Sequence, residues 1–334
     1  MIVGQAQVVA DAFALGQVRA FGHAADGPMS RIWRLDATSG CYAVKEFRIA
    51  PDDETPTRLE ASALLADAVR RAGVRTPRSV RSSTGSLLHG LHDHAAADVT
   101  YVSVATWIDG RTCEVRRDAE TAAAWLGETL AAIELVPDPP NPPPLDPWLA
   151  GWLTESPTEA QWCAVLDQAY RAGRPWAEVL ESRIPRLANL TAVVGSPSND
   201  RQSMLHTDLQ PKNVLVTSTG FALLDWDDAA LCSRDLILGR TLVEWLTPDG
   251  VHTDAITRFL RSYRARGGSG AIADLSHFGY AAAAHLNHVH EAVTSDLADD
   301  HDDGNSAWLV TAALTNPLDL STLEHVLDIL RTAE

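Results

Sequence analysis

The sequence predicts an α+β fold of two lobes: a small lobe of mainly antiparallel strands with one long helix over residues 1–106, and a larger, mainly helical lobe over residues 107–334. Two observations predict it. Before residue 107, short β-rich runs alternate with turns, and one segment has helical spacing. After Gly110, apolar residues recur at helical spacing over most of the chain. With 334 residues, of which 46% are hydrophobic, the chain can bury a sizeable core.

Strand patterns dominate the small lobe. In "RIWRLDA" apolar and polar residues alternate, and "CYAVKEF" is a β-rich run after a Ser-Gly turn. The predicted elements, in order, are strands within 17–49, a helix over 57–74 that ends at Gly73, a hairpin over 79–92, and a buried strand over 99–108 that closes at Asp109-Gly110.

Helical patterns dominate the larger lobe, interrupted by one loop-and-strand segment. Asp118 is the predicted N-cap of a helix that runs to residue 135. Residues 137–147 contain seven prolines, which predicts an extended connector. The remaining predictions are helices over 158–171 and 175–189, a loop, strand, turn and strand over 204–229, and helices over 235–334 with breaks at 248–250 and 267–270.

The charge of the chain excludes some classes of partner. Lys and Arg number 27 and Asp and Glu 44, which gives a net charge of −17. A chain this acidic is a poor general binder of nucleic acid, and it suits a cationic small molecule better. No stretch reaches 18 apolar residues and the N-terminus has no basic signal region, so we expect a cytoplasmic protein without membrane contacts, either a monomer or a homodimer.

The most informative segment is His206-Thr207-Asp208, with Asn213 five residues after the Asp, followed by Asp225-Trp226-Asp227. Phosphoryl transfer needs these residue types. A carboxylate must accept the proton of an attacking hydroxyl, and amide and carboxylate oxygens must hold Mg²⁺ against the nucleotide phosphates. A loop that carries Asp and Asn, followed by a hairpin that returns a second Asp, brings the three groups together.

The segment "HTDLQPKNVL…FALLDWDDA…RDL" resembles the aminoglycoside phosphotransferase family, whose kinase-like enzymes include choline and homoserine kinases. The family pattern is H-G-D-x-x-x-x-N followed by D-x-D, and here Thr207 replaces the Gly. The resemblance implies a bilobal protein-kinase-like fold, with a catalytic loop at 205–228 and acceptor-binding helices in the larger lobe. It also implies ATP or GTP and Mg²⁺ as cofactors.

Carried over position by position, the resemblance implies a role for each residue of the motif. Asp208 would be the catalytic base, with His206 supporting its loop and Asp235 bracing it. Asn213 and Asp225 would be the Mg²⁺ ligands. Asp227 and Asp228 lie near the same site, without roles that the sequence separates.

The small lobe would then hold the nucleotide. The chain contains 25 Arg but only two Lys, and Lys45 lies in the predicted strand "YAVKEF". A lysine there can reach the α- and β-phosphates, with Glu60 on the following helix as its expected ion-pair partner. No G-x-G-x-x-G occurs, so Ser30 is the candidate for the phosphate loop. The hinge "ATWIDG" would bind adenine through the backbone of Thr106, Trp107 and Ile108.

Two histidine groups have the same H-x-x-H-x-H spacing: His89, His92 and His94, and His285, His288 and His290. Neither spacing gives three ligands on one face of a helix or strand, so zinc is disfavoured. His288 or His290 in a substrate cleft is the more favoured interpretation.

These features predict an O-phosphotransferase that acts on a small hydroxylated molecule. Residues 285–334 hold ten carboxylates and one Arg, which favours a cationic acceptor and adds Glu291, Asp299 and Asp300 to the acceptor-site candidates. An antibiotic such as an aminoglycoside and a metabolite of the choline or homoserine type remain alternative acceptors. A catalytically silent nucleotide-binding protein is the alternative from another class.

Overall fold

The computed structural model describes residues 3–27, 30–47, 54–92, 99–195, 201–248, 250–298, 305–315 and 318–333. The chain divides into two compact units. Unit 1 comprises Met1–Thr112, Val136–Pro143 and Lys212–Ala229, and unit 2 comprises Cys113–Leu135, Pro144–Pro211 and Ala230–Glu334. Unit 1 therefore extends past the predicted boundary at residue 106 and includes part of the predicted catalytic loop. The functional assignment of two lobes stays a prediction.

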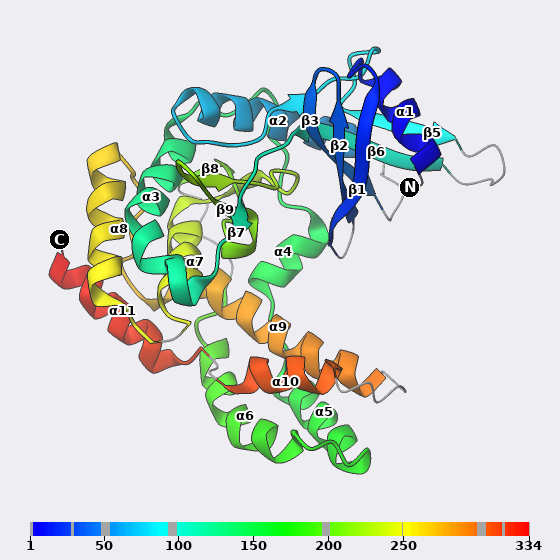
Figure 1. Ribbon diagram of the computed structural model, residues 1–334. Helices are drawn as coiled ribbons and strands as arrows, with labels where there is room; N and C mark the ends of the chain where they lie inside the picture. The colour runs from blue at the N-terminus through cyan, green and yellow to red at the C-terminus, as the bar shows by residue number, and fades with distance from the viewer. Residues whose placement is uncertain are drawn as a thin grey trace. The chain divides into compact units, whose positions relative to one another are not determined.

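Unit 1 is built on a mainly antiparallel sheet, as the sequence predicts (Figure 1). Strands β1, β2, β3 and β6 are neighbours in that order, and β4 and β5 both pair with β6. Its elements are α1 Val3–Ala12, β1 Val18–Asp26, β2 Ser30–Ala37, β3 Gly40–Phe47, α2 Thr55–Arg71, β4 Ser79–Val80, β5 Leu88–His92, β6 Val99–Thr106 and β7 Arg111–Thr112, then the 3-10 turn η1 Pro211–Asn213, β9 Val214–Thr217 and β10 Gly220–Leu223.

Strand β3 is central in this sheet because it pairs with β2 on one side and β6 on the other. Lys45 lies opposite Ile32 of β2 and Ser103 of β6. Alternate residues of β3 are buried, and Val44 belongs to an apolar core that includes Phe13 from the end of α1. A central strand with a packed face fixes the position of the lysine that it carries.

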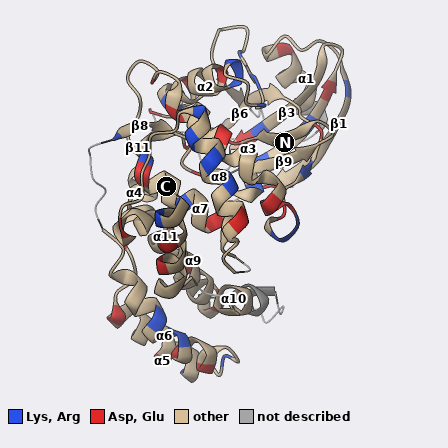
Figure 2. Cartoon of the chain, turned by 90° about the vertical axis from the view of Figure 1, so that its left-hand side faces the viewer, with Lys and Arg blue, Asp and Glu red and all other residues tan. Residues whose placement is uncertain are grey.

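Unit 2 is mainly helical. Its elements are α3 Val115–Leu135, α4 Pro147–Thr154, α5 Glu159–Arg171, α6 Ala177–Thr191, β8 Gln202–Leu205, β11 Ala230–Ser233, α7 Arg234–Leu246, α8 Thr253–Arg266, η2 Leu275–Phe278, α9 Gly279–Ala298, α10 Asn305–Thr315 and α11 Leu320–Ala333. Within this unit α8 is amphipathic: Ile256, Phe259 and Tyr263 are buried, and a group of basic side chains lies along the helix (Figure 2).

Two predicted local structures are wrong. The expected hairpin over 79–92 does not form, because β4 and β5 each pair with β6 instead of with one another. Asp118 is not an N-cap, because α3 begins at Val115 and the Asp118 carboxylate accepts a hydrogen bond from the backbone N–H of Glu114 at 2.9 Å. The helix begins about one turn earlier than predicted, and the acidic side chain still satisfies a free N–H at this helix end.

The other predicted elements are confirmed to within a few residues, including the helix after β3, the two helices that follow the proline-rich connector, and the strand–turn–strand segment. The structure adds α1, so the small lobe has a second helix that was not predicted, together with α4 and the short strands β7, β8 and β11. No helix in the described part of the chain is long and apolar enough to span a membrane.

A close helix crossing in unit 2 gives a first prediction. Gly127 of α3 packs against α8, where a Cβ atom would overlap the carbonyl oxygen of Phe259 and lie 2.9 Å from the backbone nitrogen of Tyr263. Gly127→Ala should lower the free energy of unfolding by about 1–3 kcal/mol, because backbone atoms cannot move aside as a flexible side chain can.

Gly151→Ala is the matched control. It also lies in a helix, but its Cβ would meet only the Glu155 carboxylate at 4.0 Å. It should be neutral or stabilising by about 0.5–1 kcal/mol, since alanine favours the helix. Urea denaturation of both variants measures the difference, and equal effects would contradict the close approach.

Candidate active site

Lys45 lies between two carboxylates of unit 1. Its Nζ is 2.8 Å from Asp225 Oδ1 and 2.8 Å from Asp227 Oδ2. The lysine side chain is 21% exposed, so the ammonium itself is largely shielded from water. Burial alone would lower the pKa of Lys45, but the charges of Asp227 and Asp225 outweigh it and raise the pKa above its ordinary value. The ammonium is therefore charged and fixed.

The β9–β10 hairpin brings Asn213 and Asp225 to the same end of the ladder. Val214 pairs with Leu223, and the N–H of Leu224 donates to the carbonyl of Asn213 at 2.8 Å. Asn213 therefore directly precedes the first strand, and Asp225 follows the second strand by two residues. Asp225 has a left-handed backbone, with φ of 58°, a conformation that Asp tolerates better than most residues. The hairpin predicted from the motif spacing is confirmed.

The hairpin is fastened to the segment after α2. The N–H of Leu223 donates to the carbonyl of Arg75 at 2.9 Å, and the indole N–H of the buried Trp226 donates to Thr76 Oγ1 at 2.6 Å. On the opposite edge, β7 pairs with β9, and Gly110 lies so close that a Cβ there would be 2.9 Å from the Val216 carbonyl oxygen. These contacts hold the segment that carries both aspartates.

The predicted ion pair between Lys45 and Glu60 is wrong. The Glu60 carboxylate binds the Arg81 guanidinium, with Nη1 at 2.7 Å from Oε2 and Nη2 at 2.5 Å from Oε1. Arg81 Nη1 also donates to the carbonyl of Gly85 at 3.1 Å. A bidentate arginine is a stronger partner for a carboxylate than a single ammonium, and it fastens α2 to the turn after β4.

The predicted nucleotide contacts lie at two places in unit 1. Ser30 is buried at the start of β2, and its carbonyl accepts a hydrogen bond from the N–H of Gly27 at 2.8 Å, which closes the turn after β1. At the end of β6, the N–H of Thr106 donates to the Arg78 carbonyl and that of Trp107 to the Cys41 carbonyl, both at 2.9 Å. These two amides are engaged within the sheet. Among the described hydrogen bonds, none uses the N–H of Ile108.

The Asp208 loop belongs to unit 2. It follows β8, which pairs with β11. His206 is buried, and its Nδ1 accepts the backbone N–H of Asp208 at 3.2 Å. Thr207, at the position where the family pattern has Gly, is buried as well. The imidazole ring thus closes the turn that presents the Asp208 carboxylate.

Helix α7 holds this loop through a residue that the sequence analysis missed. Arg240 is 4% exposed, and its guanidinium contacts the Thr207 carbonyl at 2.6 Å, Asp208 Oδ1 at 3.2 Å and Glu244 Oε1 at 2.7 Å. Glu244 Oε1 also accepts from Gln210 Nε2 at 3.0 Å. The available signal was an Arg inside the apolar run "DLILGRTLVEWL", because a buried charge requires partners.

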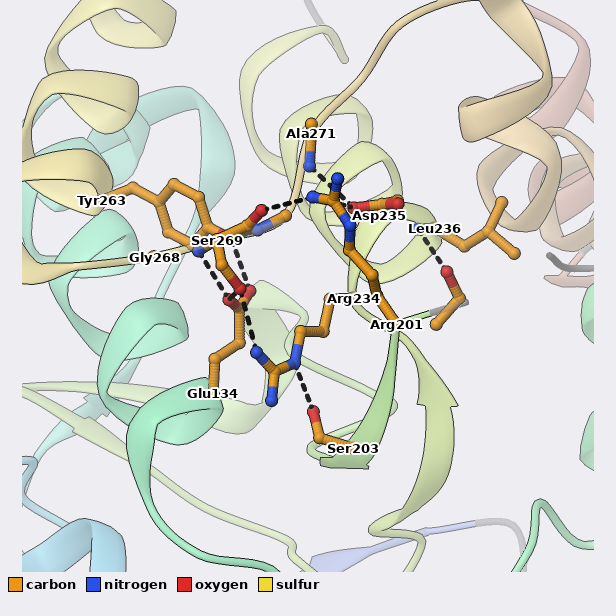
Figure 3. A network of polar contacts seen from close by, with 12 residues as sticks. Glu134, Arg201, Ser203, Arg234, Asp235, Leu236, Tyr263, Gly268, Ser269 and Ala271 are labelled. Atoms are coloured by element: carbon orange, nitrogen blue, oxygen red, sulfur yellow. Dashed lines mark hydrogen bonds and ion pairs between the residues drawn. The ribbon is translucent and has the colours of Figure 1, made fainter. Parts of the chain in front are cut away.

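Asp235 does not brace this loop. It lies in the first turn of α7, and its Oδ1 accepts the N–H of Ala271 at 2.7 Å and lies 3.9 Å from Arg201 (Figure 3). Nearby, the buried Glu134 accepts the Tyr263 hydroxyl at 2.6 Å and the N–H of Ser269 at 3.1 Å. Asp235 therefore secures the 269–271 segment, and Arg240, more than one turn later on the same helix, contacts the Asp208 loop.

Helix α9 carries several acceptor-site candidates. His288 and Glu291 are exposed. His290 makes an edge contact with the fully buried Trp162, at 5.2 Å between ring centroids. Asp296 is buried against Trp176 Nε1 at 2.9 Å and is not part of an exposed acidic loop. Asp299 and Asp300 lie outside the described residues, as does His94.

A pair of tryptophans on α4 contrasts with these core residues. Trp148 is 68% exposed and stacks on Trp152, with 5.3 Å between ring centroids. Asn287 of α9 fixes this helix by donating to the carbonyls of Trp152 and Glu155, each at 2.9 Å. The stacked rings form a supported aromatic surface.

The described residues contain no group of three or more His, Cys, Asp or Glu side chains that could hold a metal ion. The predicted ligands are instead one amide, on Asn213, and one carboxylate, on Asp225. This all-oxygen donor set suits Mg²⁺, which takes few protein ligands and completes its coordination with substrate phosphates and water.

Arg240 gives a second prediction. Arg240→Met should lower the free energy of unfolding by about 2–4 kcal/mol, because it leaves the carboxylates of Asp208 and Glu244 without their counter-charge. Urea denaturation measures the change. The double variant Arg240→Met, Glu244→Leu should recover part of the loss, since one of the two uncompensated charges is then removed. Equal losses in the single and double variants would contradict this electrostatic explanation.

His285 gives a third prediction, which concerns pH. Its Nε2 accepts the N–H of Leu318 at 3.1 Å, and burial lowers its pKa to about 4. In the unfolded state the pKa of His285 is about 6.5, so between pH 6.5 and pH 4 only the unfolded state takes up the proton. The free energy of unfolding therefore falls as the pH is lowered through this range, by up to about 3 kcal/mol.

The free energy of unfolding, measured from pH 7 to pH 4.5, should decrease less steeply in His285→Gln, which keeps an acceptor but does not titrate. Identical slopes in the two proteins would exclude His285 as the cause.

Comparisons with known proteins agree with this geometry. A family model described as the phosphotransferase enzyme family matches residues 25–267. No curated protein sequence matches the chain. Among solved structures, the fold is similar to an amicoumacin kinase bound to AMP-PNP and Ca²⁺, with 14% identity, TM-score 0.61 and 96% of both chains covered.

Two further structures have the same fold. A spectinomycin phosphotransferase in complex with ADP and spectinomycin has 12% identity and a TM-score of 0.60, with 99% of this chain and 97% of that chain covered. A microcompartment-associated aminopropanol kinase has 14% identity and a TM-score of 0.60, with 98% of both chains covered. With the family model matching well over half of its length, the chain belongs to the phosphotransferase enzyme family.

Proposed function

We propose that the protein is an O-phosphotransferase that moves the γ-phosphoryl group of ATP or GTP to a hydroxyl group of a small cationic molecule. The observation that carries the proposal is the position of Lys45, whose ammonium lies 2.8 Å from the carboxylates of both Asp225 and Asp227. A fixed cation beside a candidate metal ligand is the arrangement that binding a nucleotide's phosphates requires.

On the nucleotide side, Lys45 binds the phosphates, and Asn213 and Asp225 are the ligands for Mg²⁺. The ion, when bound, offsets negative charge on the phosphates as the phosphoryl group leaves. The turn before Ser30 is the candidate cover for the phosphates. Because the amides of Thr106 and Trp107 are engaged in the sheet, the N–H of Ile108 is the hinge donor that we assign to the base.

On the acceptor side, Asp208 accepts the proton of the attacking hydroxyl group. His206 and Arg240 hold its loop, so the carboxylate is oriented before the substrate arrives. A base fixed in advance loses little conformational freedom in the transition state, which is where such positioning raises the rate.

The acceptor is proposed to be cationic. The net charge of −17 attracts amines, and Asp228, His288 and Glu291 remain candidates for its site, together with Asp299 and Asp300. The exposed face of Trp148 could take up an alkylammonium group through a cation–π contact. Two of the similar structures are named for antibiotics and one for aminopropanol, which combines an amine with a hydroxyl group.

A direct assay tests this proposal. The purified protein, with Mg²⁺ and ATP or GTP, is given aminoglycosides, spectinomycin, amino alcohols and sugars as acceptors, and phosphorylated products are detected by mass spectrometry. A phosphorylated amino compound is the expected product. Binding of Mg²⁺-nucleotide without transfer to any acceptor would favour the catalytically silent alternative.

Asp208 supplies the matching prediction. Asp208→Asn should lower kcat by about 10²–10⁴-fold, because the amide cannot accept the hydroxyl proton. The Kd for nucleotide should stay close to that of the unaltered protein. Near-normal turnover in this variant would remove Asp208 from the mechanism.

A further inference from the structure

Lys45 of unit 1 does not contact the partner that we expected from the sequence, the glutamate of the following helix. The helix glutamate that would bind it, Glu60, is held by two hydrogen bonds from Arg81. Lys45 is held instead by the loop after β10, through Asp225 and Asp227. The two carboxylates differ in a way that separates their roles.

Asp225 is the proposed metal ligand and its side chain is 47% exposed. Asp227 is less exposed, at 31%, and its Oδ2 atom is buried and accepts no hydrogen bond from the described residues apart from its ion pair with Lys45. A buried carboxylate oxygen that contacts a single ammonium has lost its hydration. Removing the Lys45 ammonium would therefore leave a buried charge without compensation and would destabilise the folded protein.

The local backbone fixes this geometry. Trp226, between the two aspartates, is buried and bonded to Thr76, and the carboxylates on either side of it both contact Lys45. A carboxylate that binds a divalent cation has its negative charge offset by the metal, so it attracts a neighbouring ammonium less strongly. When Asp225 binds the metal, Asp227 is left as the counter-charge of the lysine.

We propose that Asp227 is a positioning residue that sets Lys45 for the nucleotide phosphates, in place of the glutamate of α2. This inference rests on the proposed function for its kinetic consequence. The contact itself exists in the protein without nucleotide, so it can be tested separately. Glu60 and Arg81 then form a structural pair that fastens α2 and has no direct role at the phosphates.

The first experiment needs neither nucleotide nor metal. The chain has only two lysines, Lys45 and Lys212, so incorporation of lysine labelled with ¹³C at Cε gives two NMR signals, which the variant Lys212→Arg assigns. Asp227→Asn should shift and narrow the Lys45 signal, because the ammonium loses a fixed partner. Glu60→Gln, an equal chemical change, should leave it in place. A Lys45 signal that responds to Glu60→Gln and not to Asp227→Asn would overturn the proposal.

Nucleotide binding provides a second measurement. Asp227→Asn removes a negative charge beside the phosphate site, so metal-free ATP should bind more tightly than to the unaltered protein in calorimetric titrations. At the same time, kcat with Mg²⁺-ATP should fall about tenfold to hundredfold, because the lysine is no longer held in the productive position. Opposite effects on binding and turnover distinguish misplacement of Lys45 from a general loss of structure.

Two kinetic outcomes would contradict the positioning role. If Asp227→Asn raises the Mg²⁺ concentration needed for half-maximal activity, Asp227 is a metal ligand. If it raises mainly the KM for the acceptor, Asp227 belongs to the acceptor site. A protein that shows the expected NMR shift but phosphorylates no acceptor would disprove the proposed function and leave the contact between Asp227 and Lys45 intact.

Discussion

The hydrogen bonds and ion pairs of the buried Arg240 guanidinium hold the Asp208 loop of unit 2 in place. A charge in the middle of an apolar helix costs free energy unless each of its donors finds an acceptor. Here the acceptors are a loop carbonyl, the carboxylate of Asp208 and a carboxylate one turn along α7. The helix and the loop can therefore reach their native positions only together, and Asp208 is oriented by the same contact that stabilises the helix.

Unit 1 contains a centre of the same kind. Both centres are largely buried cations that contact two carboxylates: Lys45 contacts Asp225 and Asp227, and Arg240 contacts Asp208 and Glu244. In each case one of the two carboxylates is a predicted reactive or metal-binding group. In a chain with 44 acidic and 27 basic residues, these two cations thus stand beside carboxylates to which we assign a part in the chemistry.

How far the sequence predicts this arrangement depends on the range of the interactions. The hairpin that carries Asn213 and Asp225 follows from residue spacing, because a two-strand ladder with a Gly turn fixes which residues are opposite. The partner of Glu60 does not follow from residue spacing, because Arg81 lies 21 residues away in the sequence and no local pattern predicts their contact. The pairing of short strands such as β4 cannot be predicted for a similar reason. Two residues are too few to show a periodic pattern, and β4 is a strand only because it pairs with β6. Asp235 and Arg240 lie on one helix, and the packing of α7, not its sequence, decides which of them faces the loop.

The division of the chain has a consequence for synthesis. Unit 1 takes its last strands from Lys212–Ala229, so the chain passes between the units five times. While the first 112 residues leave the ribosome, the groups of Arg75 and Thr76 that will bind the hairpin have no partners, and Lys45 has neither of its aspartates. The six-stranded N-terminal sheet, whose strands all lie before residue 107, can form early, but the small sheet of β7, β9 and β10 is complete only after residues 214–223 have been made. Nascent chains of this protein therefore carry the unpaired strand β7 and an incomplete unit 1 through much of translation, and an incompletely folded unit of this kind is prone to aggregation.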